Sequence, residues 1–535
     1  MNKIATYLNE HLLGEVSSAA SLRKKYSTDS GILSITPEIV AFPRVTNDIR
    51  KIARFSWQLA EKGHIVGITA RGLGNNTTSS AIGKGIIIDT SKYTNLILQI
   101  VPKEKIVHIE AGVRLDTLYQ VVKWHGLEID GLSNCGLVQP GTVGSAIATG
   151  EVGYGGSLAS AVERLEVVLA NGDVIETSRI SRRDVNKKLG QQTFEGELYR
   201  KLAGLIEDNE ELINQMSADE TYDLTGYGNI TKVRGRDGSF DLTPLFIGSQ
   251  GTLGIISEVV LRTGFYFEES VMGAVTASSM QLARDIADRA SELNPSELVI
   301  IDGELLRRAA TQGVSFHALG DVSEVGAVMY FCFNDSSARA QNHKLKKLKK
   351  VLNKINVGIV DSTEYPEEDF LAIGALGSSL SLVSSTTDSA SLPILNGASV
   401  PTSRREEFEQ AVEALSAQHH VDLPHILDVI HGTYKFFPQI SIDSVGNKQK
   451  IFKLMADFAV TVDKFGGAVA SGSGEGRILA NAAWANLTDE QAALYEQIRA
   501  IFDPFKTLNP GVKQKNEMRS LVAALRAGYD SSNML

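Results

Sequence analysis

Short apolar runs separated by amphipathic stretches mark the first third of the chain. Apolar residues recur at helical spacing over 46–62 and 115–125, so we predict helices there, and residues 1–25 are also expected to be helical. Runs rich in apolar and β-branched residues predict buried strands. The predicted strands are IVAFP (39–43), IVGITA (65–70), GIIID (85–89) and IVHIEAG (106–112).

Two strand-like runs in LEVVLANGDVIET (165–177) are joined by Asn171-Gly172. This residue pair is the one best suited to a type I′ turn, in which both central residues have positive φ. We therefore predict a hairpin with a type I′ turn at this position.

A second α+β unit is predicted beyond about 262–270, where the pattern changes. Its apolar periodicity predicts two helices with two strands between them, and two further helices nearer the C-terminus. The helices are 278–294, 336–355, about 445–465 and about 488–502, and the strands are 297–302 and 327–334.

Length and composition indicate a globular protein of two or more domains, with 535 residues, 43% hydrophobic and 22% charged. The net charge of −10 argues against nucleic acid as the main partner. The N-terminal residues contain acids and no uninterrupted apolar core, and no run approaches the roughly 18 apolar residues of a membrane helix. Two distant cysteines, Cys135 and Cys332, exclude a CxxC zinc site and a disulfide framework. A cytoplasmic location is therefore the default expectation.

The segment ITARGLGNNTTSS (68–80) predicts an anion-binding loop. A strand runs into Gly72 and Gly74, and backbone N–H groups near glycine can converge on an anion because no side chain obstructs them. The amide and hydroxyl side chains of residues 75–78 would add neutral hydrogen-bond donors.

This segment has three possible interpretations: a Walker A loop, a Rossmann motif and an ordinary polar loop. A Walker A loop would end in Gly-Lys-Ser/Thr, which is missing here. A Rossmann motif is a closer rival, with Asp89 as the ribose ligand. However, only about eight residues separate Thr77 from the next strand, and a parallel crossover needs about a dozen or more, usually helical. The spacing argues against the Rossmann motif, and the polar loop stays open.

Five motifs follow one another in YSTDSGILSITPEIVAFPRVTNDI (26–49), RGLGNN (71–76), VQPGTVGSAIATGEVGYGG (138–156), LFIGSQGTLGIISEVVL (245–261) and LNPGVK (508–513). Together they resemble the flavin-binding domain of the vanillyl-alcohol oxidase family, also called the PCMH type. The nearest branch resembles the glycolate oxidase D subunit and FAD-linked D-lactate dehydrogenases. GASVPTSRREEF (397–408) and KFGGAVASGSGEGR (464–477) are similar to landmarks of that branch's second domain.

The resemblance implies an α+β fold in which a two-lobed PCMH-type FAD-binding domain occupies residues 1–265. A cap domain, expected over 266–480, would bind substrate and contain an antiparallel sheet covered by helices. Residues 481–535 would form a C-terminal segment that returns to the FAD domain.

The same resemblance implies FAD as the cofactor, with its pyrophosphate as the anion held by the glycine loop. Tight packing is the alternative explanation for the small residues at 141–150, and a turn before Pro510 is the alternative for Asn509. The implied cofactor contacts are Arg71, Gly72, Leu73, Gly74, Asn75, Asn76, Pro140, Gly141, Thr142, Gly144, Ser145, Ala148, Thr149, Gly254, Ile255, Ile256 and Asn509.

Asn75 bears on how the flavin is attached. Family members that bond FAD through this loop carry a histidine after the second glycine, and asparagine cannot form that link. FAD is therefore expected to be non-covalent. Cys135 and His125 are the nearby nucleophiles, and a buried thiol and a helix-end imidazole are the simpler explanations for them.

The second domain departs from the hydroxy-acid branch, which resembles it in other respects. The branch carries a HxGDGNxH pattern and a histidine-containing SGEHGIG, which bind a divalent metal. Here His431 remains, whereas the other two histidines align with Phe437 and Ser473. One imidazole with Glu475 makes a poor divalent site, so we expect no metal. The carboxylate-binding arginine of the branch is also missing from 370–388, where serine and threonine are abundant.

Four residues of the second domain are candidates for chemistry. His431 would be the general base, because a histidine pKa lies near working pH, with a satisfied core or surface histidine as the alternative. Tyr434 and Lys435 would orient substrate, with an aromatic core residue and a solvated lysine as the alternatives. Arg477 would bind an anionic group, with a structural salt bridge as its alternative. Arg404, in VPTSR, is expected to fix a contact between domains.

A lysine-rich amphipathic helix is predicted at 343–355, with Leu345, Leu348, Leu352 and Ile355 on one face. A solvated face over a core stripe is the common explanation for this pattern. Peripheral docking to an anionic membrane is the functional alternative.

The resemblance implies an FAD-dependent oxidoreductase that oxidises the alcohol carbon of a small hydroxy acid or related polyol by hydride transfer to flavin N5. Electrons would pass to quinone, a protein acceptor or oxygen. Two alternatives stay open, because the histidines and the arginine are missing. One is an oxidase of a neutral sugar or lactone, and the other is a flavin-binding partner subunit without catalysis.

Overall fold

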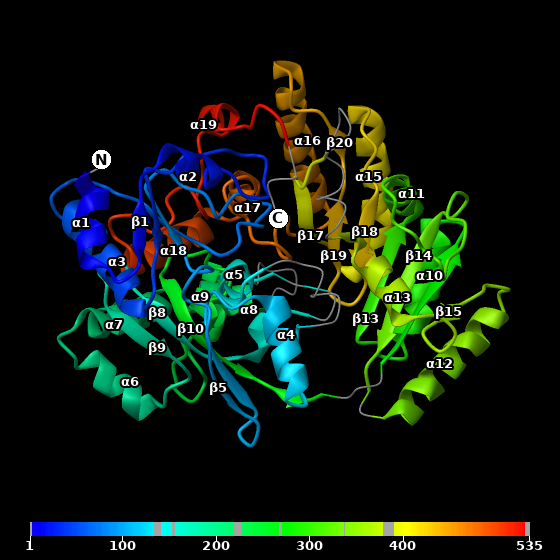
Figure 1. Cartoon of the computed structure of the whole chain (residues 1–535), viewed down its shortest axis with the longest axis horizontal. Helices are drawn as coiled ribbons and strands as arrows, with labels where there is room; N and C mark the ends of the chain where they lie inside the picture. Colours follow the sequence, from blue (N-terminus) through cyan, green and yellow to red (C-terminus); the bar gives the residue numbers. More distant parts are fainter. Residues whose placement is uncertain are drawn as a thin grey trace.

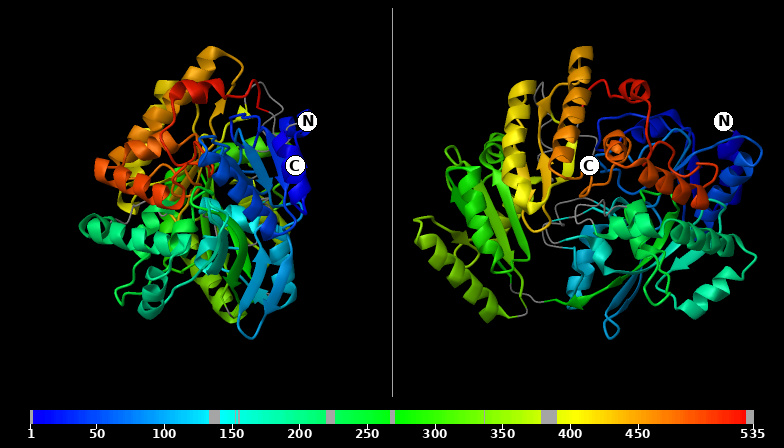
Figure 2. Two further views of the ribbon diagram at one scale, coloured as in Figure 1. Left: turned by 90° about the vertical axis from the view of Figure 1, so that its left-hand side faces the viewer. Right: turned by 180° about the vertical axis from the view of Figure 1, so that it is seen from behind.

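A computed structural model describes residues 3–132, 141–151, 153, 156–218, 226–266, 270–335, 337–377 and 390–529 of the chain. Figure 1 shows two regions side by side, one built from the N-terminal half and one built around the sheet of residues 271–436. The view from behind in Figure 2 shows the same division. Within the described ranges, no helix is long and apolar enough to cross a membrane.

A four-stranded sheet carries the predicted glycine loop. Its order is β1-β2-β4-β3, and α3 covers it with Ile49, Ile52 and Ala53. The N-terminal 25 residues contain a strand between two helices, so the prediction of helix there was wrong over the residues of β1. The elements are α1 (Lys3–His11), β1 (Glu15–Ser17), α2 (Ala20–Lys25), β2 (Ile39–Phe42), α3 (Thr46–Ala60), β3 (Ile68–Arg71) and β4 (Ile86–Asp89).

Strands β3 and β4 are parallel neighbours, with Ile68 opposite Ile86 and Arg71 opposite Asp89. The spacing argument against a parallel pair was therefore wrong, because it counted from Thr77 although β3 already ends at Arg71. The connection 72–85 is long enough for a crossover but contains no helix. The missing helix, and not the spacing, distinguishes this loop from a Rossmann motif.

A five-stranded antiparallel sheet forms the second layer of this region, in the order β5-β6-β10-β8-β9. Helices from distant parts of the chain share its core, including α18 through Leu494, Ile498 and Phe502. The elements are β5 (Ile97–Val101), β6 (Ile106–Glu110), α4 (Leu115–Trp124), β7 (Leu127–Glu128), α5 (Val143–Thr149), η2 (Leu158–Ala161), β8 (Val162–Val168), β9 (Val174–Thr177), α6 (Arg182–Leu189), α7 (Phe194–Asp208), α8 (Glu210–Ala218), η3 (Gly226–Lys232), α9 (Thr243–Phe246), β10 (Ile255–Arg262) and β11 (Gly264–Phe265).

The predicted hairpin joins β8 to β9, but its turn differs from the prediction. Gly172 has φ +85°, whereas Asn171 does not have positive φ. Gly172 N–H donates to Leu169 O at 2.9 Å, and Leu169 N–H donates to Asp173 O at 2.8 Å. This is a type I turn followed by a glycine bulge, which needs positive φ at the glycine alone.

A seven-stranded antiparallel sheet organises the other region, in the order β15-β12-β14-β13-β18-β19-β17. Side chains alternate along β13: Leu298 and Ile300 face α10, α12, α15 and α16, whereas Val299 and Ile301 face α11 and α13. This confirms the antiparallel sheet covered by helices. The elements are β12 (Val271–Ala277), α10 (Met280–Ser291), β13 (Glu297–Asp302), α11 (Gly303–Thr311), β14 (Ala327–Phe333), α12 (Ala338–Asn353), β15 (Val360–Asp361), α13 (Glu367–Gly374), β16 (Ala390–Ser391), β17 (Leu395–Ser399), η5 (Thr402–Arg404), α15 (Arg405–His419), β18 (His425–Asp428), β19 (Thr433–Phe436), β20 (Gln439–Ile440) and α16 (Val445–Lys464).

The last described segment connects the two regions. Ile68 N–H donates to Thr507 O at 2.8 Å, so this segment extends the four-stranded sheet beyond β3. Leu521 and Leu525, by contrast, pack in the cluster on the seven-stranded sheet. The remaining helices are α17 (Ala480–Ala485), α18 (Asp489–Phe502) and α19 (Met518–Ala523).

Candidate cofactor site

A cavity opens where the loop after β3, helix α5 and the segment before β10 meet. It brings together most of the cofactor contacts that the sequence predicts, from three segments far apart in the chain. The lining residues are Ala70, Arg71, Gly72, Gly74, Asn75, Asn76, Ser80, Ala81, Thr90, Ala111, Gly144, Ser145, Ala148, Thr149, Gln250, Gly251, Gly254, Ile255 and Ile256.

The side chain of Arg71 supports the glycine loop. Its guanidinium donates to Thr28 O at 2.8 Å and lies against Gly74, where an added Cβ would be 2.0 Å from Arg71 Nη2. Gly74 also has φ +79°, so a side chain is excluded both by the backbone conformation and by the nearby guanidinium. Burial lowers the pKa of Arg71, and the carboxylates of Asp29 and Asp89 oppose that effect.

Asn76 gives the loop its shape. Its Oδ1 accepts hydrogen bonds from Ser80 N–H at 2.8 Å, Thr78 N–H at 3.0 Å and Thr78 Oγ1 at 3.2 Å. These bonds hold residues 76–80 in a tight curve without a helix. The side-chain oxygen of Asn76 is thus engaged within the loop, and the surrounding backbone is fixed in position for a ligand.

Helix α5 approaches the loop and β6 closely, because its first turn consists of small residues. Thr142 caps the helix in a capping box with Ser145. An added Cβ on Gly144 would be 2.7 Å from Ala111 Cβ, and one on Gly72 would be 2.4 Å from Thr142 Oγ1. The small residues therefore serve tight packing, which was the alternative explanation, and at the same time line the cavity.

The residues present suit a dinucleotide diphosphate with an apolar ring system. Backbone N–H groups, hydroxyls and the Arg71 cation suit a diphosphate, and Ile255 and Ile256 offer an apolar wall. Gln250 Nε2 is buried and has no hydrogen-bond partner in the described part of the chain, so it leaves a donor for a ligand acceptor. The chemistry of the cavity thus fits FAD.

Four predicted contacts in the described part of the chain do not line this cavity. Gly141 and Thr142 lie beside it, since an added Gly141 Cβ would be 3.7 Å from Asn75 Nδ2 and Thr142 contacts Gly72. Leu73 belongs to the loop but is not part of the lining. Pro140 lies outside the described residues, as does Cys135.

Asn509, the fourth, lies behind the wall of the cavity. It is 1% exposed, and its Nδ2 donates to Gln250 O at 2.7 Å and to Ser80 O at 2.9 Å. Ser80 and Gln250 both line the cavity, so Asn509 holds two of its walls together. These two bonds position the cavity walls, and the predicted contact of Asn509 with the flavin edge stays a prediction.

His431 is oriented by a neighbouring carboxylate that the sequence reasoning missed. Its Nδ1–H donates to Asp428 Oδ2 at 2.7 Å, and its backbone N–H donates to Asp428 Oδ1 at 3.1 Å. The opposite nitrogen, Nε2, faces Gly156, where an added Cβ would be 3.6 Å away. Burial lowers the pKa of His431, but the bond and charge of Asp428 outweigh it and leave the pKa raised. The spacing of three residues in LDVIH was an available signal for this pair.

Tyr434 and Arg477, both predicted to act in catalysis, are buried and bonded within the fold. Tyr434 is buried in the core of the seven-stranded sheet and donates to Glu409 Oε1 at 2.9 Å. Arg477 is buried and donates to the backbone oxygens of Ile82 and Pro510. Burial lowers the pKa of Arg477 to about 10. It therefore joins backbone segments, and its partners are carbonyl groups and not the carboxylate of a salt bridge.

The other predicted positions have local partners. Lys435 lies in β19, opposite Asn396 and Ile426. Arg404 pairs at 3.0 Å with Glu407 on the adjacent helix, so it does not fix a contact between the two regions. Glu475 pairs with Lys513 at 2.5 Å, and both side chains are buried.

Two residues aligned with metal-binding histidines of the relatives have structural roles. Phe437 is buried in the core on the α11 side of the sheet, and Ser473 Oγ donates to Asn396 O at 2.9 Å. Within the described ranges, no group of three His, Cys, Asp or Glu side chains is placed to hold a metal ion.

Comparisons with known proteins agree with this arrangement. Residues 37–178 match the model of the FAD binding domain, and residues 268–512 match that of the FAD linked oxidases, C-terminal domain. D-2-hydroxyglutarate dehydrogenase of Haemophilus influenzae is 25% identical over 97% of this chain and 53% of its own length. The chain thus spans about half the length of that relative.

Two further relatives differ in extent. Glycolate oxidase subunit GlcD of Bacillus subtilis is 23% identical over 92% of each chain. L-gulonolactone oxidase of Mus musculus is 33% identical, over 28% of this chain and 33% of its own.

Solved structures share the fold along almost the whole chain. A 4-ethylphenol oxidase from Gulosibacter chungangensis superposes with a TM-score of 0.69 at 14% identity, covering 96% of this chain and 97% of that one. p-Cresol methylhydroxylase gives a TM-score of 0.68 at 14% identity over 97% and 98% of the two chains. The chain therefore contains an FAD binding domain and the C-terminal domain of the FAD linked oxidases, and it has the fold of p-cresol methylhydroxylase along almost its whole length.

Proposed function

We propose that this protein binds FAD and oxidises the alcohol carbon of a small hydroxy acid or related polyol. The observation that carries the proposal is the single cavity formed by the glycine loop, α5 and the segment before β10, with its unpartnered Gln250 donor. The names of the relatives, which act on D-2-hydroxyglutarate and glycolate, support a hydroxy acid.

Bound FAD would supply the acceptor for a hydride from the carbinol carbon. In this proposal the Arg71 loop holds the pyrophosphate and Gln250 donates to an acceptor on the cofactor. His431 accepts the hydroxyl proton at Nε2, because Asp428 keeps the other nitrogen protonated and fixes the ring. The raised pKa that Asp428 produces makes His431 a stronger base.

The division into a FAD-binding domain (1–265), a cap domain (266–480) and a returning segment (481–535) is part of the proposal. Separate clusters on the five-stranded and seven-stranded sheets support the first boundary. The packing of α18 with the five-stranded sheet supports the second.

Non-covalent attachment of FAD follows from Asn75, which lines the cavity and cannot form a histidyl link. Denaturing the yellow protein with acid should release all flavin into the supernatant. Colour that remained in the precipitate would contradict this part of the proposal.

Anaerobic reduction tests the reaction. Bleaching of the flavin by D-2-hydroxyglutarate, glycolate or D-lactate would support a hydroxy-acid substrate, whereas bleaching by neutral sugars or lactones alone would favour the second candidate. The match to L-gulonolactone oxidase over residues of the flavin region favours that candidate. A yellow protein that dithionite reduces but no substrate does would indicate the third candidate, a partner subunit without catalysis.

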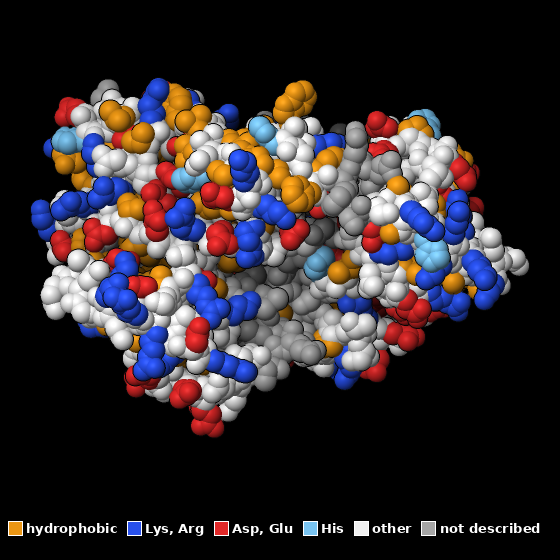
Figure 3. Space-filling view, turned by 90° about the horizontal axis from the view of Figure 1, so that it is seen from below, with side chains coloured by type: hydrophobic (Ala, Val, Ile, Leu, Met, Phe, Trp, Pro, Cys, Tyr) orange, Lys and Arg blue, Asp and Glu red, His pale blue; other side chains and the backbone are white. Residues whose placement is uncertain are grey.

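We also propose that α12 docks on an anionic membrane and so brings the flavin near a quinone acceptor. Leu345, Leu348 and Leu352 are buried against the sheet, which leaves the lysines outside. Lys344 and Lys349 pair with acids, but Lys346, Lys347, Lys350 and Lys354 are exposed. Figure 3 shows Lys and Arg side chains gathered over this end of the molecule.

A lipid-flotation assay tests the docking. The protein should float with vesicles that contain phosphatidylserine, and a variant with the four exposed lysines changed to Gln should not. Equal flotation of both proteins, or flotation of neither, would remove the membrane from the proposal.

A further inference from the structure

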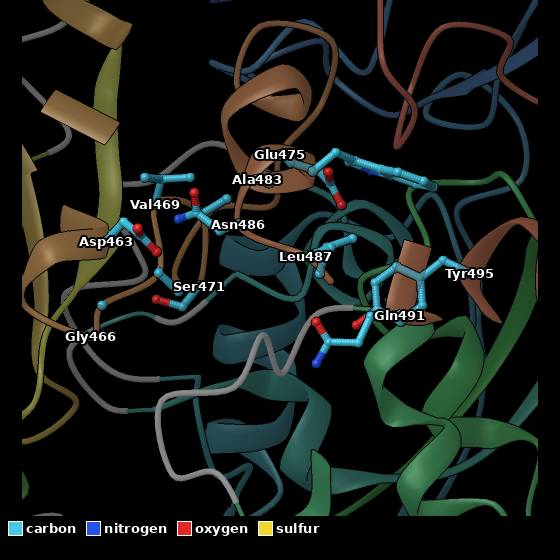
Figure 4. Close-up of a pocket in the computed structure, with 14 residues that line it drawn as sticks. Asp463, Gly466, Val469, Ser471, Glu475, Ala483, Asn486, Leu487, Gln491 and Tyr495 are labelled. Atoms are coloured by element: carbon cyan, nitrogen blue, oxygen red, sulfur yellow. The ribbon is translucent and has the colours of Figure 1, made fainter. Parts of the chain in front are cut away.

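A second cavity, of about 230 Å³, lies between the segment that follows α16 and the helices α17 and α18. Figure 4 shows Glu475, Leu487 and Tyr495 on one side of it and Val469, Ser471 and Asp463 on the other. None of its lining residues is shared with the cofactor cavity. It is therefore a separate candidate binding site.

Tyr495 leaves an unsatisfied hydroxyl at this cavity. The residue is 3% exposed, and its Oη is buried without a hydrogen-bond partner in the described part of the chain. A buried hydroxyl without a partner costs about 1–3 kcal/mol, so such groups are rare unless something else satisfies them. A ligand with a hydroxyl, ether or carbonyl oxygen would do so.

The remaining lining combines an aromatic wall with uncharged polar groups. Trp484 is 5% exposed and packs edge-to-face with Tyr495 at 6.1 Å, and Leu487 and Val469 add apolar surface. Ser471, Asn486 and Gln491 contribute hydroxyl and amide groups. Aromatic faces and amides together are suited to ligands with C–H faces and equatorial hydroxyls.

The charges at the cavity disfavour an anion. Among the described residues no lysine or arginine lines it, and two acids, Asp463 and Glu475, do. Lys513 neutralises Glu475 through the 2.5 Å ion pair, and Asp463 is exposed near the entrance. The interior is therefore close to neutral, and an incoming carboxylate would meet no cation.

The size of the cavity suits a ligand with a single ring. A cavity of about 150 Å³ accommodates benzene, so about 230 Å³ leaves room for a ring with several hydroxyl substituents. We propose that this cavity binds an uncharged, hydroxylated ring compound of monosaccharide size, with Tyr495 Oη donating to one of its oxygens and Trp484 beside its ring. This site is separate from the cofactor cavity and does not rest on the proposed reaction.

Tryptophan fluorescence tests the site without any measurement of activity. The chain has three tryptophans, so Trp57→Phe with Trp124→Phe leaves Trp484 as the reporter in the full-length, FAD-loaded protein. The neutral probes are myo-inositol and D-glucose, and D-gluconate is the anionic counterpart of similar size. We expect a saturable change in emission with a neutral probe below about 10 mM and none with gluconate.

Two matched variants locate the binding. Tyr495→Phe removes only the unpartnered hydroxyl and should weaken binding about fivefold to tenfold, the worth of one hydrogen bond. Tyr199→Phe, in the same hydrophobic cluster but outside the cavity, should leave binding unchanged. Ala483→Leu, which fills the cavity, should abolish the response.

Three outcomes would overturn the proposal. The absence of a saturable response to either neutral probe up to 50 mM would leave the cavity as a hydrated cleft. Gluconate binding as well as glucose would contradict an uncharged ligand. Equal affinity of the Tyr495→Phe and Tyr199→Phe proteins would mean that the probe binds elsewhere.

Discussion

Asp428 holds the His431 ring by accepting from its Nδ1–H at 2.7 Å, and it also accepts from the His431 backbone N–H. One carboxylate therefore fixes both the position and the tautomer of the imidazole. The nitrogen that faces Gly156 is the one left to accept a proton.

Asp428→Asn should shift the pH dependence of substrate oxidation. His431 must be neutral to act as a base, so activity rises with pH through its pKa, which Asp428 raises despite burial. The substitution should move this limb to lower pH and lower kcat about tenfold to a hundredfold, since the ring loses its orientation. Asp457→Asn, which removes the analogous partner of His419, is the matched control and should leave the profile unchanged.

The pairing of Asp428 with His431 should also make stability depend on pH. Because the folded pKa of His431 is raised, its stabilising effect is complete below the unfolded value, about 6.5, and is lost as pH rises through the folded pKa. The wild-type protein should therefore lose a part of its Tm advantage over His431→Gln between about pH 6 and pH 8. A constant difference in Tm across that range would contradict the pairing.

Gly74→Ala should reduce flavin binding more than stability. An added methyl group would collide with the Arg71 guanidinium and displace the loop that is proposed to hold the pyrophosphate. Gly63→Ala is the control, because Gly63 has a similar φ, +82°, but nothing within 4 Å of its Cβ position. Both variants should lower the free energy of unfolding by about 1 kcal/mol, because alanine is strained at positive φ. Only Gly74→Ala should be purified with less bound flavin.

Asn509→Ala should loosen the cofactor cavity from behind. The change removes two hydrogen bonds that join Ser80 and Gln250, so we expect a higher Kd for FAD, by about tenfold. Asn509→Gly is the matched comparison. Asn509 has φ +42°, so glycine removes the amide without the backbone strain that alanine would add. Equal weakening of FAD binding with better stability of the glycine variant would identify the amide as the cause.

Lys513→Met should destabilise the fold strongly. It would leave the buried Glu475 carboxylate without its 2.5 Å partner, which typically costs about 3–5 kcal/mol. The double variant Glu475→Leu with Lys513→Met should recover much of the lost Tm, because neither charge of this pair then remains buried. A double variant no more stable than the single one would show that packing, and not charge, was lost.

Much of the fold could be predicted from local pattern. The apolar stripe of α12 and the alternation along β13 and β14 are visible in the sequence because each depends on one element facing one core. The parallel pairing of β3 and β4 was missed, because strand ends depend on partner strands and cannot be located from one segment alone. The hairpin turn was misjudged for a related reason: Asn-Gly is compatible with two turns, and the register of β8 and β9 selects one.

Some residues of the candidate site could likewise be predicted from local pattern, and others could not. Glycines of the loop and of α5 could be predicted to lie together because close approach of backbone segments leaves a compositional signal. Arg477 and Asn509 looked like ligand contacts, since buried polar side chains at conspicuous motifs bind backbone carbonyls as readily as they bind cofactors. Asp428 and Gln250 were missed because their importance depends on what folding places beside them.

The bond from Asn509 to Ser80 spans 429 positions of the chain. At translation rates of about 5–20 residues per second, the ribosome needs roughly 20–90 s after making the glycine loop before it supplies the residue that braces it. The nascent protein must therefore keep this crevice unfinished until residue 509 has been made. Stable capture of the cofactor should therefore follow this contact, and it depends on how well the unfinished crevice is protected in the meantime.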